Sequence, residues 1–407
     1  MKKINVVYAG WGERFVLGQL ADDGDDLLFE YSAEALQRGL ELSPLKLPLA
    51  ASTYGAFPAH QLRLPGLVSD ALPDGWGMLL MDRLFRKEGR EPGRMSPLER
   101  LAFIGDKAMG ALLFEPADSD SLVPADVQLL ELANEVRQVM SDGSEALLRE
   151  LALMGGSPHG ARPKVLVNFD RQTNRMWNTD QGAGTPWLVK FPAQHEHAEV
   201  CAVEALYGAL ATACELRMPA TVHFDLGSGL SAFGIERFDR VNGLRVPMHT
   251  AAGAMHVDFR VPQVDYVALL RLTQFMTRDA REVRQAFERC VFNVIFNNRD
   301  DHAKNFSFLL GADGRWQFSP AYDLTFNEGP GGEHQMDICG EARAPARQHL
   351  LQLARMTGIA ERDAKQAIER IASVAGQLRR FAQALPILPD TLGLIEREVE
   401  ANRSRML

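Results

Sequence analysis

Several features that would place the chain in a familiar class are missing from its 407 residues. There are only four cysteines, and no two of them form a Cys-x-x-Cys pair, so neither a disulfide framework nor a cysteine-rich zinc site is indicated. We expect them to be small, buried residues of a protein from the reducing cytoplasm. The four are Cys201, Cys214, Cys290 and Cys339.

Long apolar runs are also missing. No window approaches the roughly 20 apolar residues of a membrane helix, and the apolar run after the N-terminal MKK is too short for a signal peptide. The net charge of −9 argues against a broad nucleic-acid-binding surface. With 46% hydrophobic and 24% charged residues, the composition is that of a globular protein with two or three packed units. We therefore expect a cytoplasmic protein with no membrane partner.

The usual nucleotide-binding motifs are absent too: the chain has neither a Walker A motif nor GxGxxG, and it lacks the HRDL and DFG motifs of protein kinases. It does have a polar stretch at residues 297–324, NNRDDHAKNFSFLLGADGRWQFSPAYDL, in which Asp300 lies five residues before Asn305. A short alternating segment follows, and then GADG, which is typical of a hairpin turn. Asp323 lies just beyond the return strand.

This order of groups suits phosphoryl transfer from ATP. One Asp must accept or orient the proton of the attacking hydroxyl, while an Asn and a second Asp hold Mg²⁺ against the phosphates. Asp300, Asn305 and Asp323 have the required spacing and the intervening hairpin. From spacing alone two other interpretations stay open. One is a polar turn whose Asp and Asn side chains cap helices, and the other is a hydrolytic metal site at Asp300, Asp301 and His302.

Two further segments have features that suit a nucleotide. Residues 155–164, GGSPHGARPK, form a glycine-rich stretch whose backbone N–H groups could approach phosphate oxygens, although a plain hairpin loop is the simpler interpretation. Lys190 lies in an apolar strand, WLVKF, where a buried ammonium needs an anionic partner; a lysine that extends to solvent is the alternative. The helix expected to follow offers Glu199 and Glu204 to fix that amine.

The residues themselves resemble a known family. DDHAKNFSFLL followed by SPAYDL is similar to the HipA family, the kinase toxins of bacterial toxin–antitoxin pairs. Other stretches resemble that family in the same order: FEYSAEALQRGLELSPLKLPL, LPDGWGMLL, FIGDKAMGALLFEP, GGSPHGARPK, WLVKFP and IERFDR. The resemblance runs from about residue 6 to about residue 323, over three quarters of the chain.

The resemblance implies an α+β, two-lobed protein-kinase-like fold. We expect a HipA-type N-terminal subdomain over residues 1–120, an N-lobe-like region with the glycine-rich loop and hinge over 121–240, and a helical C-lobe with the catalytic loop over 241–407. Alternating runs at 3–9, 14–20 and 27–31 predict a small antiparallel sheet at the front. Ser96 and Glu99 predict a capping box. Residues 327–340 occupy the position of an activation segment, and their glycine-rich, polar composition is typical of a mobile one.

The resemblance also implies an ATP- and Mg²⁺-dependent serine/threonine kinase, with Asp300 as the catalytic residue and Asn305 and Asp323 as metal ligands. Ser157, seven residues before Lys164, would be the autophosphorylation site. The residues implied to bind ATP are Ser157, His159, Gly160, Lys164, Lys190, Glu204 and, through their backbones in the hinge, Glu236 and Phe238. If the hinge interpretation does not hold, Arg237, Asp239 and Arg240 are a surface charge cluster at a strand end.

The implied partners are a helix-turn-helix antitoxin (HipB-like), operator DNA through that antitoxin, and a translation factor such as an aminoacyl-tRNA synthetase as the substrate. Two alternatives remain: a kinase of small molecules, and a catalytically silent co-repressor that acts with its antitoxin. Residues 245–260 depart from the better-known members of the family. His249, His256 and Asp258 in this stretch could suggest a metal site, but isolated histidines are more often structural.

Overall fold

A computed structural model of the chain describes residues 1–118, 125–142, 145–155, 158–179, 184–227 and 229–407. These residues divide into two compact units. The first consists of Met1–Ala198, Phe224–His249 and Gly253–His256, and the second of Glu199–His223, Thr250–Ala252 and Val257–Leu407. None of the helices in these residues is long and apolar enough to cross a membrane.

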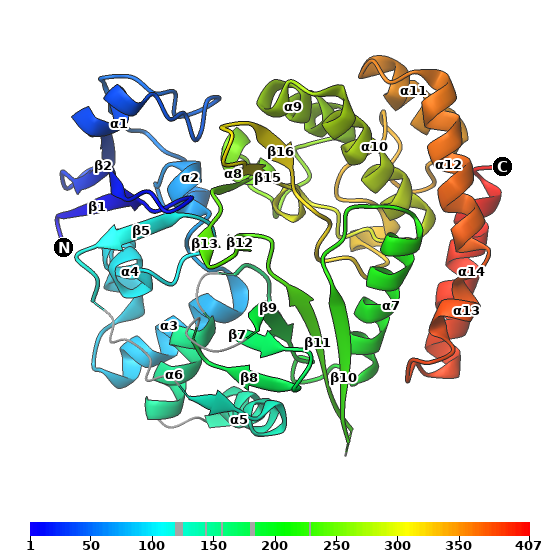
Figure 1. Cartoon of the computed structure of the whole chain (residues 1–407), viewed down its shortest axis with the longest axis horizontal. Coiled ribbons are helices and arrows are strands. Elements are labelled where there is room, and N and C mark those ends of the chain that lie inside the picture. Colours follow the sequence, from blue (N-terminus) through cyan, green and yellow to red (C-terminus); the bar gives the residue numbers. More distant parts are fainter. Residues whose placement is uncertain (119–124, 143–144, 156–157, 180–183, 228) are drawn as a thin grey trace. The chain divides into compact units, whose positions relative to one another are not determined.

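The first unit opens with an antiparallel five-stranded sheet in the order β4-β3-β2-β1-β5 (Figure 1). Side chains alternate between buried and more exposed along β3, as expected for a sheet with one face on the core. The predicted antiparallel strands at the front of the chain are confirmed. The strands are β1 (Lys3–Tyr8), β2 (Phe15–Asp22), β3 (Leu27–Tyr31), β4 (Thr53–Tyr54) and β5 (Leu112–Glu115).

Helices of the first unit connect this sheet to a second one. The predicted capping box is confirmed: the Ser96 hydroxyl accepts from the Glu99 N–H (3.3 Å) and the Glu99 carboxylate accepts from the Ser96 N–H (2.8 Å). The helices are α1 (Ala33–Arg38), α2 (Gly66–Ser69), α3 (Gly75–Lys87), α4 (Pro97–Ile104), α5 (Leu129–Asp142) and α6 (Glu145–Gly155).

The second sheet has six strands in the order β10-β11-β9-β7-β8-β6. Its core is aromatic: the Phe169 ring meets Trp187 and Phe224 edge to face, with centroids 5.4 Å apart in both pairs. Trp187 is fully buried. The strands are β6 (Asp126–Val127), β7 (Lys164–Asp170), β8 (Arg175–Trp177), β9 (Thr185–Lys190), β10 (Thr221–Gly227), which begins in the second unit, and β11 (Leu230–Glu236).

A buried ionic cluster follows β11, so the interpretation of Arg237, Asp239 and Arg240 as a surface cluster is wrong. Asp239 is 0% exposed and both arginines are buried. The Arg237 guanidinium donates two hydrogen bonds of 2.9 Å to the Asp239 carboxylate, and Arg240 donates a third (2.7 Å). The Gly110 N–H donates a fourth, of 2.8 Å. These partners hold the pKa of Asp239 far below its ordinary value although burial acts in the opposite direction.

The cluster joins two distant parts of the sequence. Arg240 also donates to the backbone carbonyls of Ala108 (3.2 Å) and Gly110 (3.1 Å). Arg245 donates to the same two carbonyls. The strands that follow are the short pair β12 (Arg240–Val241) and β13 (Leu244–Arg245), and then β14 (Met248–Thr250). The segment after β11 is therefore fixed to the N-terminal part of the same unit.

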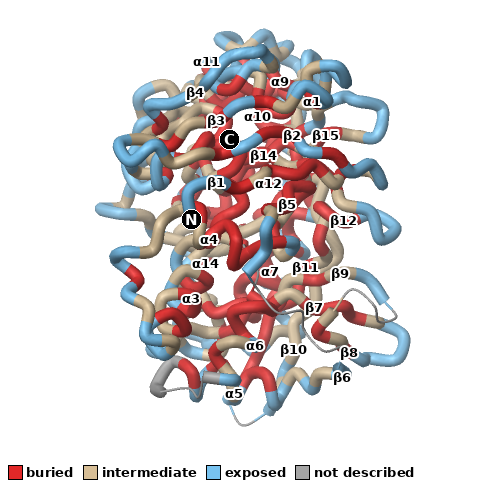
Figure 2. The backbone as a smooth tube through the Cα atoms, turned by 90° about the vertical axis from the view of Figure 1, so that its left-hand side faces the viewer, coloured by how far each residue is buried: buried red, intermediate tan, exposed pale blue. Residues whose placement is uncertain are grey.

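The second unit is mainly helical, so the predicted α+β fold with a helical C-terminal part is confirmed. Apolar residues at 3.6-residue spacing bury one face of α12, and α12, α13 and α14 lie together (Figure 1). α10 is buried along most of its length (Figure 2). The helices are α7 (Glu199–Ala213), α8 (Ala251–Met255), which continues into the first unit, α9 (Tyr266–Thr277), α10 (Ala280–Ile295), α11 (Arg347–Met356), α12 (Glu361–Ala375), α13 (Leu378–Ala382) and α14 (Pro389–Ser404). Three of the cysteines are buried as expected, whereas Cys339 is partly exposed.

Asp239→Asn should destabilise the protein by about 3 kcal/mol or more, because it leaves two buried guanidinium groups without their carboxylate. Urea unfolding followed by circular dichroism measures the loss. A pKa that is depressed in the folded state adds stability that is present above the pKa of the unfolded state and is lost as the pH falls below it. The free energy of unfolding of the wild type should therefore approach that of the variant only in strong acid. Glu361→Gln, which removes the exposed pair with Lys365 (2.7 Å), is the control and should unfold like the wild type. An Asp239→Asn protein as stable as this control would show that the cluster is not needed for folding.

Candidate functional site

The polar loop begins where α10 ends. Asn297 adopts a left-handed backbone conformation (φ 56°), which Asn tolerates better than most residues, and this turns the chain out of the helix. The Tyr207 hydroxyl donates to the carbonyl of Phe296, and the Asn298 N–H donates to the carbonyl of Asn293 (2.9 Å). The loop therefore leaves α10 in a fixed direction.

Two adjacent carboxylates in this loop have opposite environments. The Asp300 side chain is 45% exposed, and the His302 Nε2 lies 3.7 Å from its carboxylate, beyond hydrogen-bond distance. Asp301 is 0% exposed. Asp300 is thus the carboxylate that a substrate hydroxyl can reach, whereas Asp301 is part of the core.

The Asp301 carboxylate is saturated by hydrogen bonds. The Tyr266 hydroxyl (2.7 Å) and the His334 Nδ1 (2.8 Å) donate to one oxygen, and the Gln335 N–H (2.8 Å) donates to the other. A carboxylate with these partners has no lone pairs directed at an outside ion. This argues against the hydrolytic metal site of Asp300, Asp301 and His302, and no group of three or more His, Cys, Asp or Glu residues suited to a metal ion occurs in the described ranges.

Asn305 is tied directly to the catalytic candidate. It closes a short 3₁₀ turn, Ala303–Asn305, and its side-chain Nδ2 donates to the backbone carbonyl of Asp300 (2.7 Å). This bond fixes the amide plane and leaves Oδ1 as the side-chain atom that can serve a cation. The five-residue spacing seen in the sequence therefore corresponds to a hydrogen-bonded turn.

The hairpin returns the chain to this turn. β15 (Ser307–Leu310) pairs with β16 (Trp316–Phe318), and the predicted GADG turn between them is confirmed. Beyond β16, the Tyr322 hydroxyl donates to the carbonyl of Lys304 (2.7 Å). This contact places Asp323 next in sequence to a residue that touches the Asn305 turn. Asp323 has a left-handed backbone (φ 56°), a conformation that costs a non-glycine residue on the order of 1 kcal/mol and is found preferentially at functional sites.

A buried arginine packs against the hairpin. The Arg289 guanidinium lies 4.4 Å from the centroid of the Phe318 ring and donates to the carbonyl of Ser319. Burial lowers the pKa of Arg289 to about 9. Nothing in the sequence marks Arg289, because an arginine on a helix is usually a surface residue and only its tertiary contacts show its role.

Cationic groups also gather near Asp300 on the ring of Phe259. The Lys304 ammonium lies 4.5 Å from the ring centroid, the Arg260 guanidinium lies 4.5 Å from it, and the His302 ring is 5.0 Å away. Phe259 belongs to the stretch 245–260 that also contains His249 and His256. This stretch thus supplies a side chain to the surroundings of the catalytic candidate.

The donor set of the loop suits Mg²⁺, which prefers oxygen ligands and near-octahedral geometry. Asp323 offers a carboxylate and Asn305 an amide oxygen whose orientation is fixed by the Asp300 carbonyl. When bound, Mg²⁺ neutralises charge on the phosphates of a nucleotide. These two residues are consequently the ones that would hold the ion.

Residues 156 and 157 of the glycine-rich stretch are not among the described residues, so the predicted Ser157 lies outside them. The Gly160 N–H donates to the Asp74 carboxylate, and the His159 Nε2 lies 3.0 Å from the carbonyl of Leu72. Gly160 has a φ of 108°, which only glycine adopts readily. This part of the loop is therefore held against the stretch LPDGWG, rather than being a plain hairpin loop.

Two buried lysines are paired on adjacent strands of the second sheet. Lys164 on β7 is directly opposite Lys190 on β9. Both are buried, and the Lys164 ammonium donates to the carbonyl of His159. Like charges directly opposite one another are destabilising. An anionic group beside the pair would offset this repulsion. The burial of Lys190 argues against a lysine that extends to solvent.

The remaining ATP-binding candidates are a helix residue and two hinge residues. Glu204 is buried in α7 of the second unit. In the first unit the Arg237 N–H donates to the carbonyl of Pro186 (2.8 Å), so Arg237 continues the pairing of β11 with β9. Backbone groups of successive residues alternate between the two sides of a strand. Those of Glu236 and Phe238 therefore point away from β9, to the side of β11 on which β10 lies.

His249 and His256 serve the protein interior. The His249 Nδ1 lies 2.7 Å from the Asp70 carboxylate and its Nε2 lies 3.0 Å from the Ser43 hydroxyl. These are the atoms of a hydrolase triad, but Ser43 and His249 are fully buried, so no substrate can reach them. The His256 Nε2 accepts from the Gly66 N–H (3.0 Å), and burial, followed by the charges of His249 and Lys46, lowers the pKa of His256 to about 4.

Asp258, the third residue of the possible metal site with His249 and His256, has a partner as well. The Asp258 carboxylate pairs with Arg260 at 3.2 Å. The rings of both histidines are occupied by groups of the protein, so the structural interpretation of the three residues is the better one.

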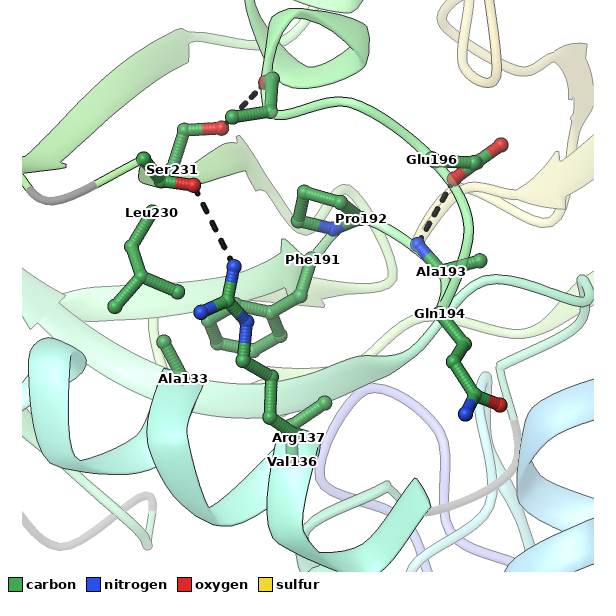
Figure 3. Close-up of a pocket in the computed structure, with 12 residues that line it drawn as sticks. Ala133, Val136, Arg137, Phe191, Pro192, Ala193, Gln194, Glu196, Leu230 and Ser231 are labelled. Atoms are coloured by element: carbon green, nitrogen blue, oxygen red, sulfur yellow. Dashed lines mark hydrogen bonds between the residues drawn. The ribbon is translucent and has the colours of Figure 1, made fainter. Parts of the chain in front are cut away.

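The first unit also contains a cavity of about 300 Å³ beside the end of β9 (Figure 3). Its walls come from α5, from the residues that follow Lys190 and from the start of β11. The Ser231 hydroxyl donates to the carbonyl of Ala198 (2.6 Å), and the Ala193 N–H donates to Glu196 (2.9 Å). Among the predicted ATP-binding residues that the structure describes, none lines it.

No curated protein matches the sequence of the chain. Among solved structures, the chain is similar to HipA of Shewanella oneidensis MR-1, in a complex with HipB and operator DNA, with a TM-score of 0.73 and 19% identity over 99% of this chain and 97% of that chain. A Helicobacter pylori proinflammatory kinase, CtkA, gives a TM-score of only 0.32, with 13% identity over 55% of this chain and 89% of that chain, which is too low to support an argument.

The likeness to the Shewanella protein shows the fold, and it confirms the predicted HipA-like architecture. Family models add the sequence relationship. The model for the HipA N-terminal domain matches residues 10–115, and the model for the HipA-like C-terminal domain matches residues 156–378, which is more than half of the chain. The protein therefore belongs to the HipA family.

Proposed function

We propose that this protein is a serine/threonine kinase toxin that transfers the γ-phosphoryl group of ATP to a protein hydroxyl. The observation that carries the proposal is the difference between the two adjacent aspartates of the polar loop. Asp300 keeps an accessible carboxylate and its backbone carbonyl binds Asn305, while Asp301 is saturated in the core. A kinase needs an accessible carboxylate beside an oxygen ligand for the metal, and this loop supplies both.

Each predicted residue takes one role in this proposal. Asp300 orients the acceptor hydroxyl and receives its proton. Asn305 and Asp323 hold Mg²⁺. The buried ammonium groups of Lys164 and Lys190 bind phosphate oxygens. The other ATP contacts are proposed for Ser157, His159 and Gly160 in the glycine-rich loop, for Glu204 as the partner of a lysine, and for the backbones of Glu236 and Phe238 at the adenine.

The partners follow from the same proposal. The Shewanella HipA was solved with HipB and operator DNA. By analogy, we propose a HipB-like helix-turn-helix antitoxin for this chain, with operator DNA bound through that antitoxin. The negative net charge of the chain agrees with DNA contacts made by the partner. For the substrate we propose a cytoplasmic translation factor such as an aminoacyl-tRNA synthetase. We propose three regions for the chain: residues 1–120 as the N-terminal subdomain, residues 121–240 as the N-lobe-like region, and residues 241–407 as the helical C-lobe.

Transfer of radiolabelled phosphate in a bacterial lysate tests the proposal and separates its alternatives. A labelled protein band that depends on added enzyme and Mg²⁺ supports the protein kinase. Label that enters only the small-molecule fraction would show a small-molecule kinase. Binding to the antitoxin with no transfer of label to any acceptor would show a co-repressor without catalysis.

Asp300→Asn should lower phosphoryl transfer about 10²-fold or more, because the amide cannot receive the hydroxyl proton. Its affinity for Mg-ATP should stay within a few-fold of the wild type, since other residues hold the nucleotide. Asp313→Asn, which changes an exposed carboxylate in the turn of the same hairpin, is the matched control and should transfer normally. Near-normal transfer by Asp300→Asn would refute the assignment.

Asp323→Ala should weaken the binding of Mg-ATP itself, because the triphosphate loses a metal ligand that balances its charge. Isothermal titration calorimetry with and without Mg²⁺ measures this. The left-handed backbone at this position strains alanine, so Asp323→Gly is made in parallel to remove the carboxylate without strain. If both variants bind Mg-ATP like the wild type, Asp323 is a structural residue.

Incubation with Mg-ATP should add one phosphate at Ser157, slowly, and the modified protein should then bind ATP poorly. The added charge of about −1.5 to −2 would repel the phosphates of the nucleotide. Ser157→Ala should keep its ATP affinity under the same treatment. Intact-protein mass spectrometry with peptide mapping follows the reaction, and a phosphate on another residue, or a phospho-Ser157 protein that still binds ATP tightly, would contradict this regulation.

A further inference from the structure

The residues on either side of Asp300 both hold the segment that follows Asp323. Arg299 is 9% exposed, and its guanidinium donates to the backbone carbonyls of Glu328 (3.4 Å), Gly332 and Arg343 (3.3 Å). These carbonyls come from three points along residues 327–343. We call this stretch the clamped segment.

Asp301 holds the middle of the clamped segment. Its carboxylate accepts from the N–H of Gln335 (2.8 Å) and from the ring of His334 (2.8 Å). The His334 N–H donates in turn to the carbonyl of Ala342 (2.8 Å), so the two arms of the segment are joined. A guanidinium that binds carbonyls and a carboxylate that binds N–H groups are complementary anchors for a single stretch of backbone.

Backbone pairing fixes the start of the clamped segment. Asn327 forms a parallel bridge with Asn298, in which the Asn327 N–H donates to the carbonyl of Asn297 (3.0 Å) and the Arg299 N–H donates to the carbonyl of Asn327 (3.2 Å). The glycine-rich composition suggested a mobile segment. The structure instead shows it bonded to the catalytic loop at both ends and in the middle.

Glycine is required where the clamped segment passes Arg299. A Cβ on Gly329 would lie 2.1 Å from the Glu333 carbonyl oxygen and 2.8 Å from the Arg299 Cβ. Gly331, two residues further along, also has a positive φ, but a Cβ there would meet nothing within 4 Å. The glycines of this stretch therefore serve a close approach as well as a turn.

The sequence of the segment adds an independent observation. Activation loops of kinases are commonly ordered by phosphorylation, through new pairs between an arginine and the phosphate. Here the arginine before the catalytic candidate already binds three carbonyls, and its Nε is buried as well. Between Phe326 and Ala346 the chain has no Ser, Thr or Tyr that a kinase could phosphorylate.

We propose that Arg299 and Asp301 are positioning residues that keep the clamped segment in its working place permanently, so that transfer requires no phosphate on this segment. The inference rests on the proposed kinase function. In this arrangement Arg299 and Asp301 do not touch the reacting atoms. They fix the backbone on both sides of Asp300, and hence the place where the acceptor hydroxyl approaches it.

The test uses the full-length protein and two measurements. Amide hydrogen exchange, read by mass spectrometry, reports the clamped segment, and incorporation of labelled phosphate from Mg-ATP into the chain reports transfer. Arg299→Gln should raise exchange in residues 327–343 while α10 stays protected, and should slow incorporation about tenfold or more. Its affinity for Mg-ATP should stay within a few-fold, a separation that general unfolding would not give. Arg299→Lys, which keeps the charge but loses the fork, should restore transfer only in part.

Gly329→Ala attacks the same contact from the segment and leaves Arg299 unchanged, which keeps the test valid if Arg299→Gln folds poorly. It should reproduce the loss of protection and of transfer. Gly331→Ala is the matched control, since it carries the same backbone strain without the clash, and it should behave like the wild type. Equal exchange and equal transfer in Gly329→Ala and Gly331→Ala would overturn the clamp.

Phosphatase treatment tests the independence from phosphorylation. The treated wild type should transfer at least as fast as the untreated protein, and peptide mapping should find no phosphate between Thr325 and Arg347. Loss of transfer on treatment, with recovery when this segment is phosphorylated again, would overturn the proposal. If the wild type labels neither itself nor any protein of a bacterial lysate, the kinase function fails, and hydrogen exchange alone then decides whether the clamp exists.

Discussion

A carboxylate buried without partners costs several kcal/mol, so Asp301, which is fully buried in the second unit, must be surrounded by hydrogen-bond donors. Its oxygens must be met by donors from elsewhere in the sequence. They come from Tyr266 on α9 and from His334 and Gln335, more than thirty residues away in either direction. Once these groups meet, the loop between α10 and β15 has one conformation. Because neighbouring residues of an extended loop point in opposite directions, the inward turn of Asp301 leaves the Asp300 carboxylate accessible.

In the first unit, Asp239 is a second fully buried carboxylate that is surrounded by hydrogen-bond donors. There the donors are two arginines and the N–H of Gly110, and the segment that is fixed follows β11, where the hinge is proposed. In both units a buried carboxylate stands one to three residues from a proposed functional backbone or side chain. Buried ionic groups are weak evidence for stability. Their position here suggests that they define geometry: hydrogen bonds have direction, so they select one arrangement of the loop where apolar packing would accept several.

The sequence was sufficient for features that depend on neighbouring residues. The front strands, the capping box at Ser96 and the GADG hairpin all follow from local alternation, capping and turn chemistry, and all are present. It singled out Asp300 by its five-residue spacing to Asn305, but it could not show that Asp301 is buried, because that depends on the donors that the rest of the chain brings to it. For Asp239 the sequence left a surface charge cluster open as the alternative to a hinge, and the burial of this cluster depends on contacts with Ala108 and Gly110, more than a hundred residues away. The contacts of Asp301 span more than thirty residues.

The opposed lysines bring the same reasoning to the nucleotide. Lys164 and Lys190 are both buried and directly opposite one another on β7 and β9. Like charges in this arrangement repel one another, and a carbonyl such as that of His159 is a dipole and not a full charge. Anionic groups lower the cost of such a pair, and the phosphate oxygens of the proposed nucleotide are groups of this kind. The proposed nucleotide site would thus depend on charges held by the sheet, whereas the position of the proposed acceptor would depend on the hydrogen bonds that Arg299 and Asp301 make to the clamped segment.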